Sequence, residues 1–309
     1  MALKIAVPDL VSNSYFPAIA AVELGCFAEQ GYDATVELIF PVDQAYAAMR
    51  NGEIDFVAGS AHSALAVFPE WKGAKLLCAQ AQGMYWFLVM RADLNPVRGD
   101  LSVVKGRRIG AAPWVEMGLR SLLVAGGIDI TDDVTIAPVP GATGSTVNFG
   151  LMAAKALEDG LIDGFWANGM AAELAVLRGI GSVVLDTRRG DGPAGAFDYT
   201  FASLAASDRL IEDQPAAAAA AVRAVVSAQS ALRNNPKLAS EIGKRLFPAL
   251  EGALIASLIE RDLPYYDAAI DPASIAGMNA FCRSHDLLRG EPAFEDVVAA
   301  QFSALWEGK

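Results

Sequence analysis

Short apolar runs alternate with longer segments of helical periodicity over the first two thirds of the chain. Strands are predicted where a short or alternating apolar run is bounded by turn residues, at "LKIAVPD", "ATVELIF", "IDFVAG" and "AKLLCAQAQ". Helices are predicted between them at "SYFPAIAAVELGCFAEQG", "DQAYAAMRNG" and "SAHSALAVFPEW". This alternation favours a mostly parallel sheet covered by helices.

The alternation begins again after an extended segment, "YWFLVMRAD". Further strands are predicted at "RRIGAA", "VTIAPVP", "IDGFWAN" and "SVVLDT", with helices at "EMGLRSLLVAGG", "GSTVNFGLMAAKALEDG" and "GMAAELAVLRG". A second extended segment, "AFDYTFASLAAS", leads into a tail that is nearly all helical from about Asp208. The pattern predicts an α/β protein of two lobes with a helical C-terminal tail, and a ligand cleft at the strand ends.

The length of 309 residues also favours two domains. The predicted first lobe is discontinuous and comprises residues 1–88 and 201–309, while residues 89–200 form the second. The predicted hinges are the two crossovers, near residues 86–92 and 197–204. The segments "NGEIDFVAGS" and "EDGLIDGFWANG" correspond between the two units.

Charge narrows the choice of partners. The net charge is −12, which disfavours nucleic acid and anionic lipid but leaves a local anion site open. No apolar run reaches the length of a membrane span, so no direct membrane insertion is expected. A strand is already predicted at residues 4–7, so no signal peptide is visible. The protein is expected in the cytoplasm, or in the periplasm if an export signal was cut off and replaced by Met1.

The three cysteines, Cys26, Cys78 and Cys282, lie far apart and form no CxxC pair. A zinc site is therefore not expected. One disulfide with a remaining thiol is one interpretation, and three buried free thiols is the simpler one.

Four motifs in this order and spacing resemble one family: "ELGCFAEQGYDATVELI", "AAMRNGEIDFVAGS", "VKGRRIGAAP…GLRSLLVAGGI" and "ALEDGLIDGFWAN". The sequence is similar to the type II periplasmic solute-binding proteins of ABC importers, in the branch for nitrate, sulfonates, taurine and thiamine-pyrimidine precursors. The resemblance implies the two-lobed type II fold, a small-molecule ligand, an ABC permease as partner, a monomer and no cofactor. It also implies that Gly25 and Gly31 serve turns, that Phe27 anchors a corner and that Cys26 is a packed bystander.

The resemblance places the site in loops at the strand ends. After the first strand these are Ser12, Asn13, Ser14 and Tyr15, which could equally be a plain helix cap. After "IDFVA" come Ser60 and His62, whose imidazole can hydrogen-bond a ligand or pack beneath the loop. His285, in the helical tail, is expected at the surface.

The second unit departs from the family pattern. Where many members grip an anion with Ser or Thr, this chain has Pro113, Trp114, Val115 and Glu116, which argues against a nitrate, sulfonate or phosphate ligand. Glu116 is either a cap-side charge or a cleft residue favouring a cationic or hydrogen-donating ligand. The aromatic residues at strand ends suggest stacking on a flat or apolar ligand, aromatic or heterocyclic. The remaining candidates are Asp43, Tyr85, Trp86, Thr143 with the neighbouring Ser145, Trp166, Asn168, Tyr199 and Thr200.

Three functions fit the sequence. The first is a binding protein that closes its lobes on a solute, without catalytic residues or metal. The second is a cytoplasmic enzyme on the same fold, related to decarboxylases, desulfinases or pyrimidine-forming enzymes. In it His62 would be the acid or base, Glu116 or Asp43 would modulate it, and Cys26 or Cys78 would be a distant nucleophile. The third is a sensing module that reports to a partner protein.

Overall fold

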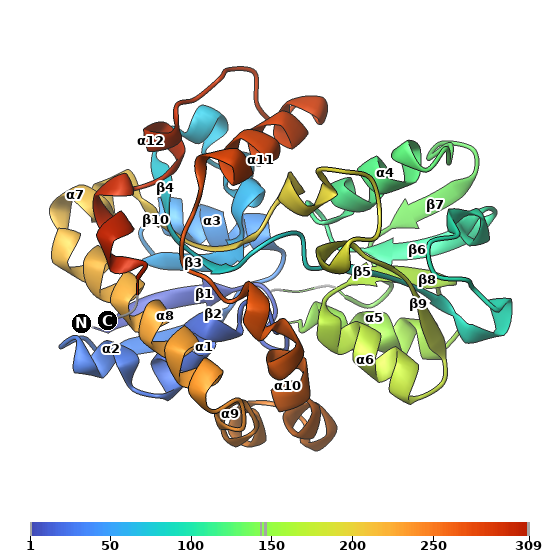
Figure 1. The fold of residues 1–309 in the computed structure, drawn as a ribbon, viewed down its shortest axis with the longest axis horizontal. Helices are drawn as coiled ribbons and strands as arrows, with labels where there is room; N and C mark the ends of the chain where they lie inside the picture. The colour runs from blue at the N-terminus through green and yellow to red at the C-terminus, as the bar shows by residue number, and fades with distance from the viewer. Residues whose placement is uncertain (1, 143, 145–146, 308–309) are drawn as a thin grey trace.

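Two five-stranded sheets form the framework of the computed structural model, which describes residues 2–142, 144 and 147–307 (Figure 1). The first sheet has the order β2-β1-β3-β10-β4, with β1 Leu3–Val7, β2 Ala34–Leu38, β3 Phe56–Ser60, β4 Ala74–Ala81 and β10 Ala202–Ser207. The second has the order β7-β6-β8-β5-β9, with β5 Phe87–Arg91, β6 Arg107–Ala111, β7 Val134–Ala137, β8 Gly164–Ala167 and β9 Gly181–Asp186. We call the first sheet with its helices lobe 1, and the second lobe 2.

Four strands of each sheet point the same way, and one runs against both of its neighbours. The reversed strand is β10 in the first sheet and β5 in the second. Each is the strand that the chain enters by crossing from the other lobe, since β5 follows β4 and β10 follows β9. The predicted two-lobed, mostly parallel α/β architecture is therefore confirmed. The exact domain boundaries given above stay a prediction.

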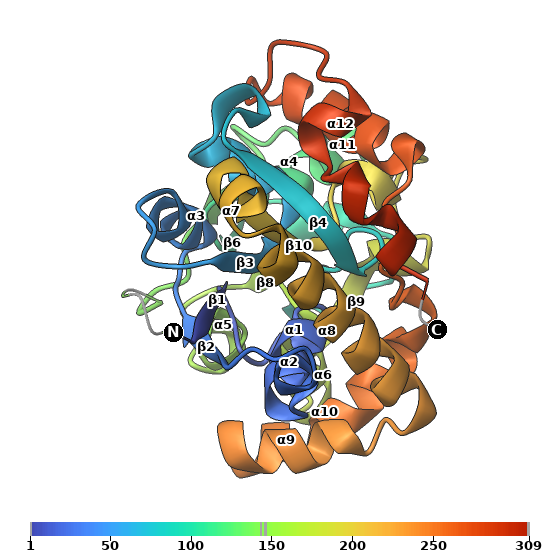
Figure 2. The same cartoon turned by 90° about the vertical axis from the view of Figure 1, so that its left-hand side faces the viewer.

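Helices cover both faces of the first sheet (Figure 2), and a hydrophobic core lies on each face. Alternation along β1 sends Ile5 and Val7 to one core and Ala6 to the other. The helices that pack together on the first face are α1 Phe16–Glu23, α2 Cys26–Glu29 and α8 Pro215–Asn234. On the second face lie α3 Val42–Arg50 and α11 Pro272–Ser284.

One predicted helix is in fact two, α1 and α2, because the chain turns at Gly25. Gly25 has φ +78°, a left-handed conformation that glycine adopts without strain, and Gly31 at φ +83° ends α2. Phe27 and Cys26 are buried at this corner, as the resemblance implies. The predicted helix "SAHSALAVFPEW" is also wrong in type, since it forms two short 3-10 helices, Ala61–Ala66 and Pro69–Trp71.

Lobe 2 is covered by α4 Glu116–Ala125, α5 Phe149–Glu158 and α6 Gly169–Leu177. The remaining helices of the tail are α7 Asp208–Asp213, α9 Leu238–Leu246, α10 Ala249–Asp262 and α12 Phe294–Val297. The segment predicted as extended from Ala196 begins instead with a 3-10 turn, Ala196–Tyr199, because Gly195 at φ +87° bends the chain before β10. Within the described ranges, no helix is long and apolar enough to cross a bilayer.

The C-terminal helices tie the lobes together (Figure 1). Helix α10 packs against α6, where Arg261 forms an ion pair with Glu173 at 3.3 Å. On the other side, the Ser121 hydroxyl of α4 lies 2.7 Å from Nε2 of His285, at the end of α11. His285 is half-buried in this contact, so its predicted place at the surface is only partly right.

Candidate functional site

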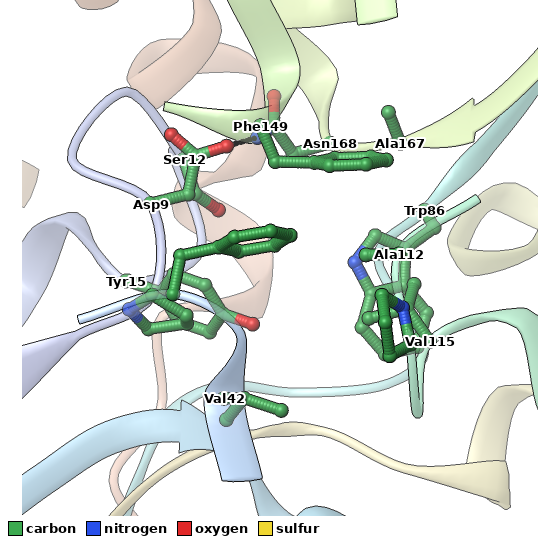
Figure 3. Close-up of a pocket in the computed structure, with 13 residues that line it drawn as sticks. Asp9, Ser12, Tyr15, Val42, Trp86, Ala112, Val115, Phe149, Ala167 and Asn168 are labelled. Carbon is green, nitrogen blue, oxygen red and sulfur yellow. Dashed lines mark hydrogen bonds between the residues drawn. The ribbon is translucent and has the colours of Figure 1, made fainter. Parts of the chain in front are cut away.

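A cavity lies between the lobes at the carboxyl ends of strands β1, β2, β6 and β8 (Figure 3). It holds about 420 Å³ of space outside the protein atoms, its open mouth included. The centre of a water-sized sphere reaches only about 30 Å³ of this space, so the closed form leaves no room for a small molecule until the lobes part. The strand-end position is the one expected for ligands in α/β sheets. The lining residues are Pro8, Asp9, Ser12, Tyr15, Phe40, Val42, Trp86, Ala112, Pro113, Val115, Phe149, Ala167 and Asn168.

Four aromatic side chains, contributed by both lobes and by the crossover between them, stand in the cavity wall. Phe40 of lobe 1 stacks on Phe149 of lobe 2, with ring centroids 5.6 Å apart and planes 21° apart. Trp86 stands on the crossover between the lobes and is 4% exposed. Figure 3 shows Trp86, Ala112 and Val115 on one wall, opposite Asp9 and Ser12. The geometry suits a flat, largely apolar ligand.

Asp9 is the acidic group of the cavity. It follows β1 and reaches into lobe 2, where Oδ2 accepts hydrogen bonds of 2.8 Å from the Gly150 amide and from Nδ2 of Asn168. Oδ1 accepts from the Val11 amide at 3.2 Å. Burial is the largest influence and raises the pKa of Asp9 to about 6, although these hydrogen bonds oppose the rise. At neutral pH the group is mainly a carboxylate.

Two further polar side chains border the cavity. Asn168 caps α6, since its Oδ1 accepts from the amides of Met170 and Ala171. The Ser12 hydroxyl is fully buried and has no hydrogen-bond partner in the part of the chain that the structure describes. A buried hydroxyl without a partner is costly, so Ser12 is available to a ligand.

Tyr15 is held from behind by a second tyrosine. The hydroxyls of Tyr15 and Tyr85 are 2.5 Å apart, and the two rings meet edge to face with centroids 5.5 Å apart. Burial raises the pKa of both tyrosines, which therefore stay neutral. Tyr85 thus positions Tyr15, which lines the cavity.

His62 lies behind the cavity wall and is 1% exposed. Its Nε2 is 2.9 Å from the Trp114 carbonyl oxygen, and its Nδ1 is 2.9 Å from the Thr200 hydroxyl. The carbonyl can only accept, so Nε2 carries the proton and Thr200 donates to Nδ1. The residue whose carbonyl oxygen contacts His62, Trp114, has a left-handed backbone with φ +70°. Both imidazole nitrogens are engaged, and His62 works as a link between the lobes.

Stability is expected to fall on acidification because of His62. Burial lowers the pKa of His62 to about 4, whereas the unfolded chain takes up this proton near its ordinary pKa of 6.5. Between these values the unfolded state binds more protons, so His62 removes about 3 kcal/mol of stability as the pH falls through the window. Asp9 has the opposite effect on stability. Its pKa is about 6 in the folded state and 3.8 in the unfolded state, so between these pH values the folded state binds more protons and Asp9 adds stability as the pH falls.

Urea denaturation of the protein and of His62→Gln across this pH range isolates the contribution of His62. In the variant, the free energy of unfolding is expected to lose the decrease on acidification that His62 causes and to keep the increase that Asp9 causes. Parallel curves at every pH would show that His62 is not buried in its neutral form.

Asn13 and Ser14 point away from the cavity into a buried polar cluster around Arg188 and Asp262. Arg188 forms an ion pair with Asp262 at 2.9 Å and donates to the Ser14 hydroxyl at 3.1 Å. Asp262 also accepts from Asn13 and Arg189. The cluster joins the loop after β1 to the segment after β9 and to the end of α10.

The other predicted site residues lie outside the cavity lining. Ser60 pairs with Ser63, with their hydroxyls 2.6 Å apart, and Trp166 donates from Nε1 to the Val115 carbonyl at 3.1 Å. Tyr199 stacks on Phe281, at 4.7 Å between ring centroids. Asp43 and Glu116 stand in the first turns of α3 and α4, half-buried, and burial raises the pKa of Glu116. Thr143 and Ser145 lie outside the described residues.

The structure thus brings Ser12, Tyr15, Trp86 and Asn168 together at one cavity. The charged lining residue that sequence reasoning missed is Asp9. Its signal was present, because a carboxylate directly follows the first strand, in "LKIAVPD". The other omissions are small or apolar residues at strand and helix ends, such as Phe40 and Phe149, which carry no chemical signal in a sequence.

The cysteines are free and buried, and none of them lines the cavity. Burial raises the pKa of all three thiols, to about 12 for Cys282, which disfavours the nucleophilic thiolate. Within residues 2–142, 144 and 147–307, no group of three or more His, Cys, Asp or Glu side chains is placed to hold a metal ion.

Comparisons with known proteins agree with this architecture. Residues 105–247 match the NMT1-like family. No curated protein matches the sequence. The fold resembles that of many solved structures.

Three examples of these structures are two sulfonate-binding proteins and DSZB. The alkanesulfonate-binding protein SsuA from Xanthomonas axonopodis pv. citri, bound to MOPS, is 14% identical with a TM-score of 0.69, over 97% of this chain and 97% of that one. The periplasmic sulfonate-binding protein SsuA from Methylobacillus flagellatus KT is 17% identical with a TM-score of 0.66, over 98% and 93%. A cysteine-to-serine mutant of DSZB in complex with biphenyl-2-sulfinic acid is 16% identical with a TM-score of 0.68, over 98% of both chains. At these identities the likeness establishes the fold.

Proposed function

We propose that this chain, which has the fold of the type II periplasmic solute-binding proteins and matches the NMT1-like family over residues 105–247, binds a small solute in the cavity between its lobes. The observation that carries the proposal is the cavity itself. It stands at the strand ends of both lobes, is walled by aromatic rings, and contains a buried carboxylate and a buried hydroxyl without a partner. The ligand is aromatic or heterocyclic, because the rings of Phe40, Phe149 and Trp86 offer faces on which a flat molecule stacks.

Binding requires the lobes to separate and close again. Phe40 and Phe149 stack across the cavity, so a ligand enters when the lobes carry these rings apart. In the described chain the sheets are connected only by residues 82–86, between β4 and β5, and by residues 187–201, between β9 and β10. The predicted hinges near residues 86–92 and 197–204 lie at the ends of these two connections. Closure on the ligand would restore the links from Asp9 to Gly150 and from His62 to Trp114.

The closed, loaded form is the one that a partner would recognise. Neighbouring structures are named as binding components of ABC importers, so we assign this chain the same role, as a monomer that delivers its solute to a permease. This role places the mature protein in the periplasm, whereas an enzyme on the same fold would act in the cytoplasm.

Trp86→Ala is expected to weaken binding of an aromatic ligand by about ten-fold or more, because it removes the ring on the hinge wall. The measurement is isothermal titration calorimetry with the best compound from a thermal-shift screen of aromatic acids, sulfonates, amines and pyrimidines. Trp306→Ala is the matched control, because Trp306 lies outside the cavity lining. Equal affinities for both variants would place the ligand elsewhere.

The enzymatic hypothesis gains its support from the likeness to DSZB. The geometry does not favour it, because both nitrogens of His62 are engaged and the cysteines lie away from the cavity. Mass spectrometry of the bound compound after long incubation separates the two. A binding protein returns the compound unchanged, whereas consumption that is lost in His62→Gln would establish an enzyme.

A further inference from the structure

Two helices of lobe 2 begin at the cavity, and their amino ends create a field that attracts negative charge. Helix α5 begins at Phe149 and α6 at Gly169, directly after the lining residue Asn168. Free amides at such ends are natural anion sites. In this chain the place at α5 is already taken, because the Gly150 amide donates to the Asp9 carboxylate at 2.8 Å.

The loop around Asp9 is arranged to hold this carboxylate at α5. Asn148, the N-cap residue of α5, makes no capping bond, and its side chain accepts instead from the Leu10 amide at 3.1 Å. Asn168 donates to the same Asp9 oxygen while capping α6. Asp9 therefore caps α5 from the other lobe and occupies the position where an anionic ligand would otherwise sit.

The negative charge of Asp9 has no cationic partner at the cavity. Among the described residues, those that line the cavity include no Lys, Arg or His. The buried Arg188 is committed to Asp262. Asp9 and Tyr15 are the ionisable lining residues, and Tyr15 stays neutral. The net charge of −12 adds a field of the same sign. Any further anion in the cavity would meet repulsion, and a cation would meet attraction.

Two oxygen atoms at the cavity, one of Asp9 and one of Ser12, can still accept hydrogen bonds from a ligand. Asp9 Oδ1 accepts only the Val11 amide, at 3.2 Å, within the described chain and keeps a free lone pair. The Ser12 hydroxyl is fully buried on the same wall without a partner (Figure 3). An oxygen of a carboxylate and an oxygen of a hydroxyl together are suited to the several N–H donors of an ammonium group.

We propose, on the basis of the proposed function, that the cavity selects a small aromatic amine in its cationic form, whose ammonium group binds Asp9 and Ser12 while its ring stacks among Phe40, Phe149 and Trp86. Aromatic anions are rejected because Asp9 occupies the amino end of α5. In this respect the chain differs from the neighbours that are named for sulfonates and nitrate.

The test compares three probes of nearly equal shape at neutral pH: benzylamine, benzyl alcohol and benzoate. Calorimetry on the full chain is expected to show benzylamine binding at least about ten-fold more tightly than benzyl alcohol, and benzoate binding more weakly than either. Asp9→Asn is expected to remove the preference for the amine. Ser12→Ala is expected to weaken the amine by about three- to ten-fold. Asp132→Asn removes the same charge from an exposed loop and serves as the matched control.

Equal binding of all three probes by the unaltered protein, lost in Trp86→Ala, would overturn the inference and leave the proposed function standing. A preference for benzylamine that persists in Asp9→Asn would overturn the role of Asp9. If none of the three probes binds, the inference fails, while the proposed function is decided separately by the thermal-shift screen and by the comparison of Trp86→Ala with Trp306→Ala. The comparison of probes on the unaltered protein needs no variant, so it decides the selectivity even if Asp9→Asn does not fold.

Discussion

Asp262→Asn is expected to destabilise the protein by about 3–5 kcal/mol, because it leaves a buried guanidinium without a counter-charge. Asp262 is 1% exposed and receives hydrogen bonds from Arg188, Arg189 and Asn13. The Arg188 side chain is 2% exposed and cannot turn to solvent. Its other contacts, to the Ser14 hydroxyl and the Gly83 carbonyl, are neutral. Burial already lowers the pKa of Arg188, because removing the charged guanidinium from water is unfavourable. Without Asp262, nothing of opposite charge compensates for this burial.

The matched control is Asp213→Asn, which breaks a surface pair with Arg209 at 3.8 Å. Both side chains of this pair are largely exposed, so the expected loss is below about 0.5 kcal/mol. Urea denaturation with a constant m-value measures both variants. A loss of less than about 1 kcal/mol for Asp262→Asn would mean that Arg188 is solvated in the native state. The cluster joins both lobes, so its loss should also loosen the closed form.

Trp166→Ala is expected to cost about 3–5 kcal/mol, as a large cavity would form in the core of lobe 2. The ring is completely buried, lies 6.3 Å from Trp86 between centroids, and donates to the Val115 carbonyl. Trp166 was predicted from the sequence as a ligand residue, but it stands outside the lining, behind Trp86. Trp166→Ala should therefore change the free energy of unfolding more than it changes ligand affinity.

Trp166→Phe separates packing from ligand contact. It keeps most of the ring volume and removes the hydrogen bond to Val115, so a loss of about 1–2 kcal/mol is expected. Ligand affinity in calorimetry should stay within about three-fold of the unaltered protein. A larger loss of affinity at nearly unchanged stability would show that Trp166 contacts the ligand directly, as the sequence-based prediction holds.

Much of the architecture follows from local patterns. The strands at residues 3–7, 34–38 and 56–60 are short, mostly apolar or alternating runs between turn residues, and this local pattern predicts them. Helical periodicity continues through "ELGCFAE" and predicts a single helix, whereas the resemblance implies a turn at Gly25, and the structure has this left-handed turn between α1 and α2. Helix α5 begins at Phe149, later than predicted, where the neighbouring Asn148 and Gly150 bond to Leu10 and Asp9 of the other lobe.

The candidate site was only partly visible in the sequence. Ser12, Tyr15, Trp86 and Asn168 stand at strand ends or on a crossover, and their positions could be predicted. Whether a side chain at a strand end turns into the cavity or behind it depends on partners that are distant in sequence. Asn13 turns away from the cavity because its amide donates to Asp262, which is 249 residues further along the chain. His62 turns away because Thr200 and Trp114 hold both of its ring nitrogens.

The sequence by itself determined the alternation of strands and helices, the two units and the strand ends as the place for a ligand. These depend on periodicity and on turn residues, which act over a few positions. The tertiary structure alone decided that Asp9 meets the amino end of α5 across the two lobes. That contact joins residues 141 positions apart, and only the packing of the lobes brings them within hydrogen-bonding distance.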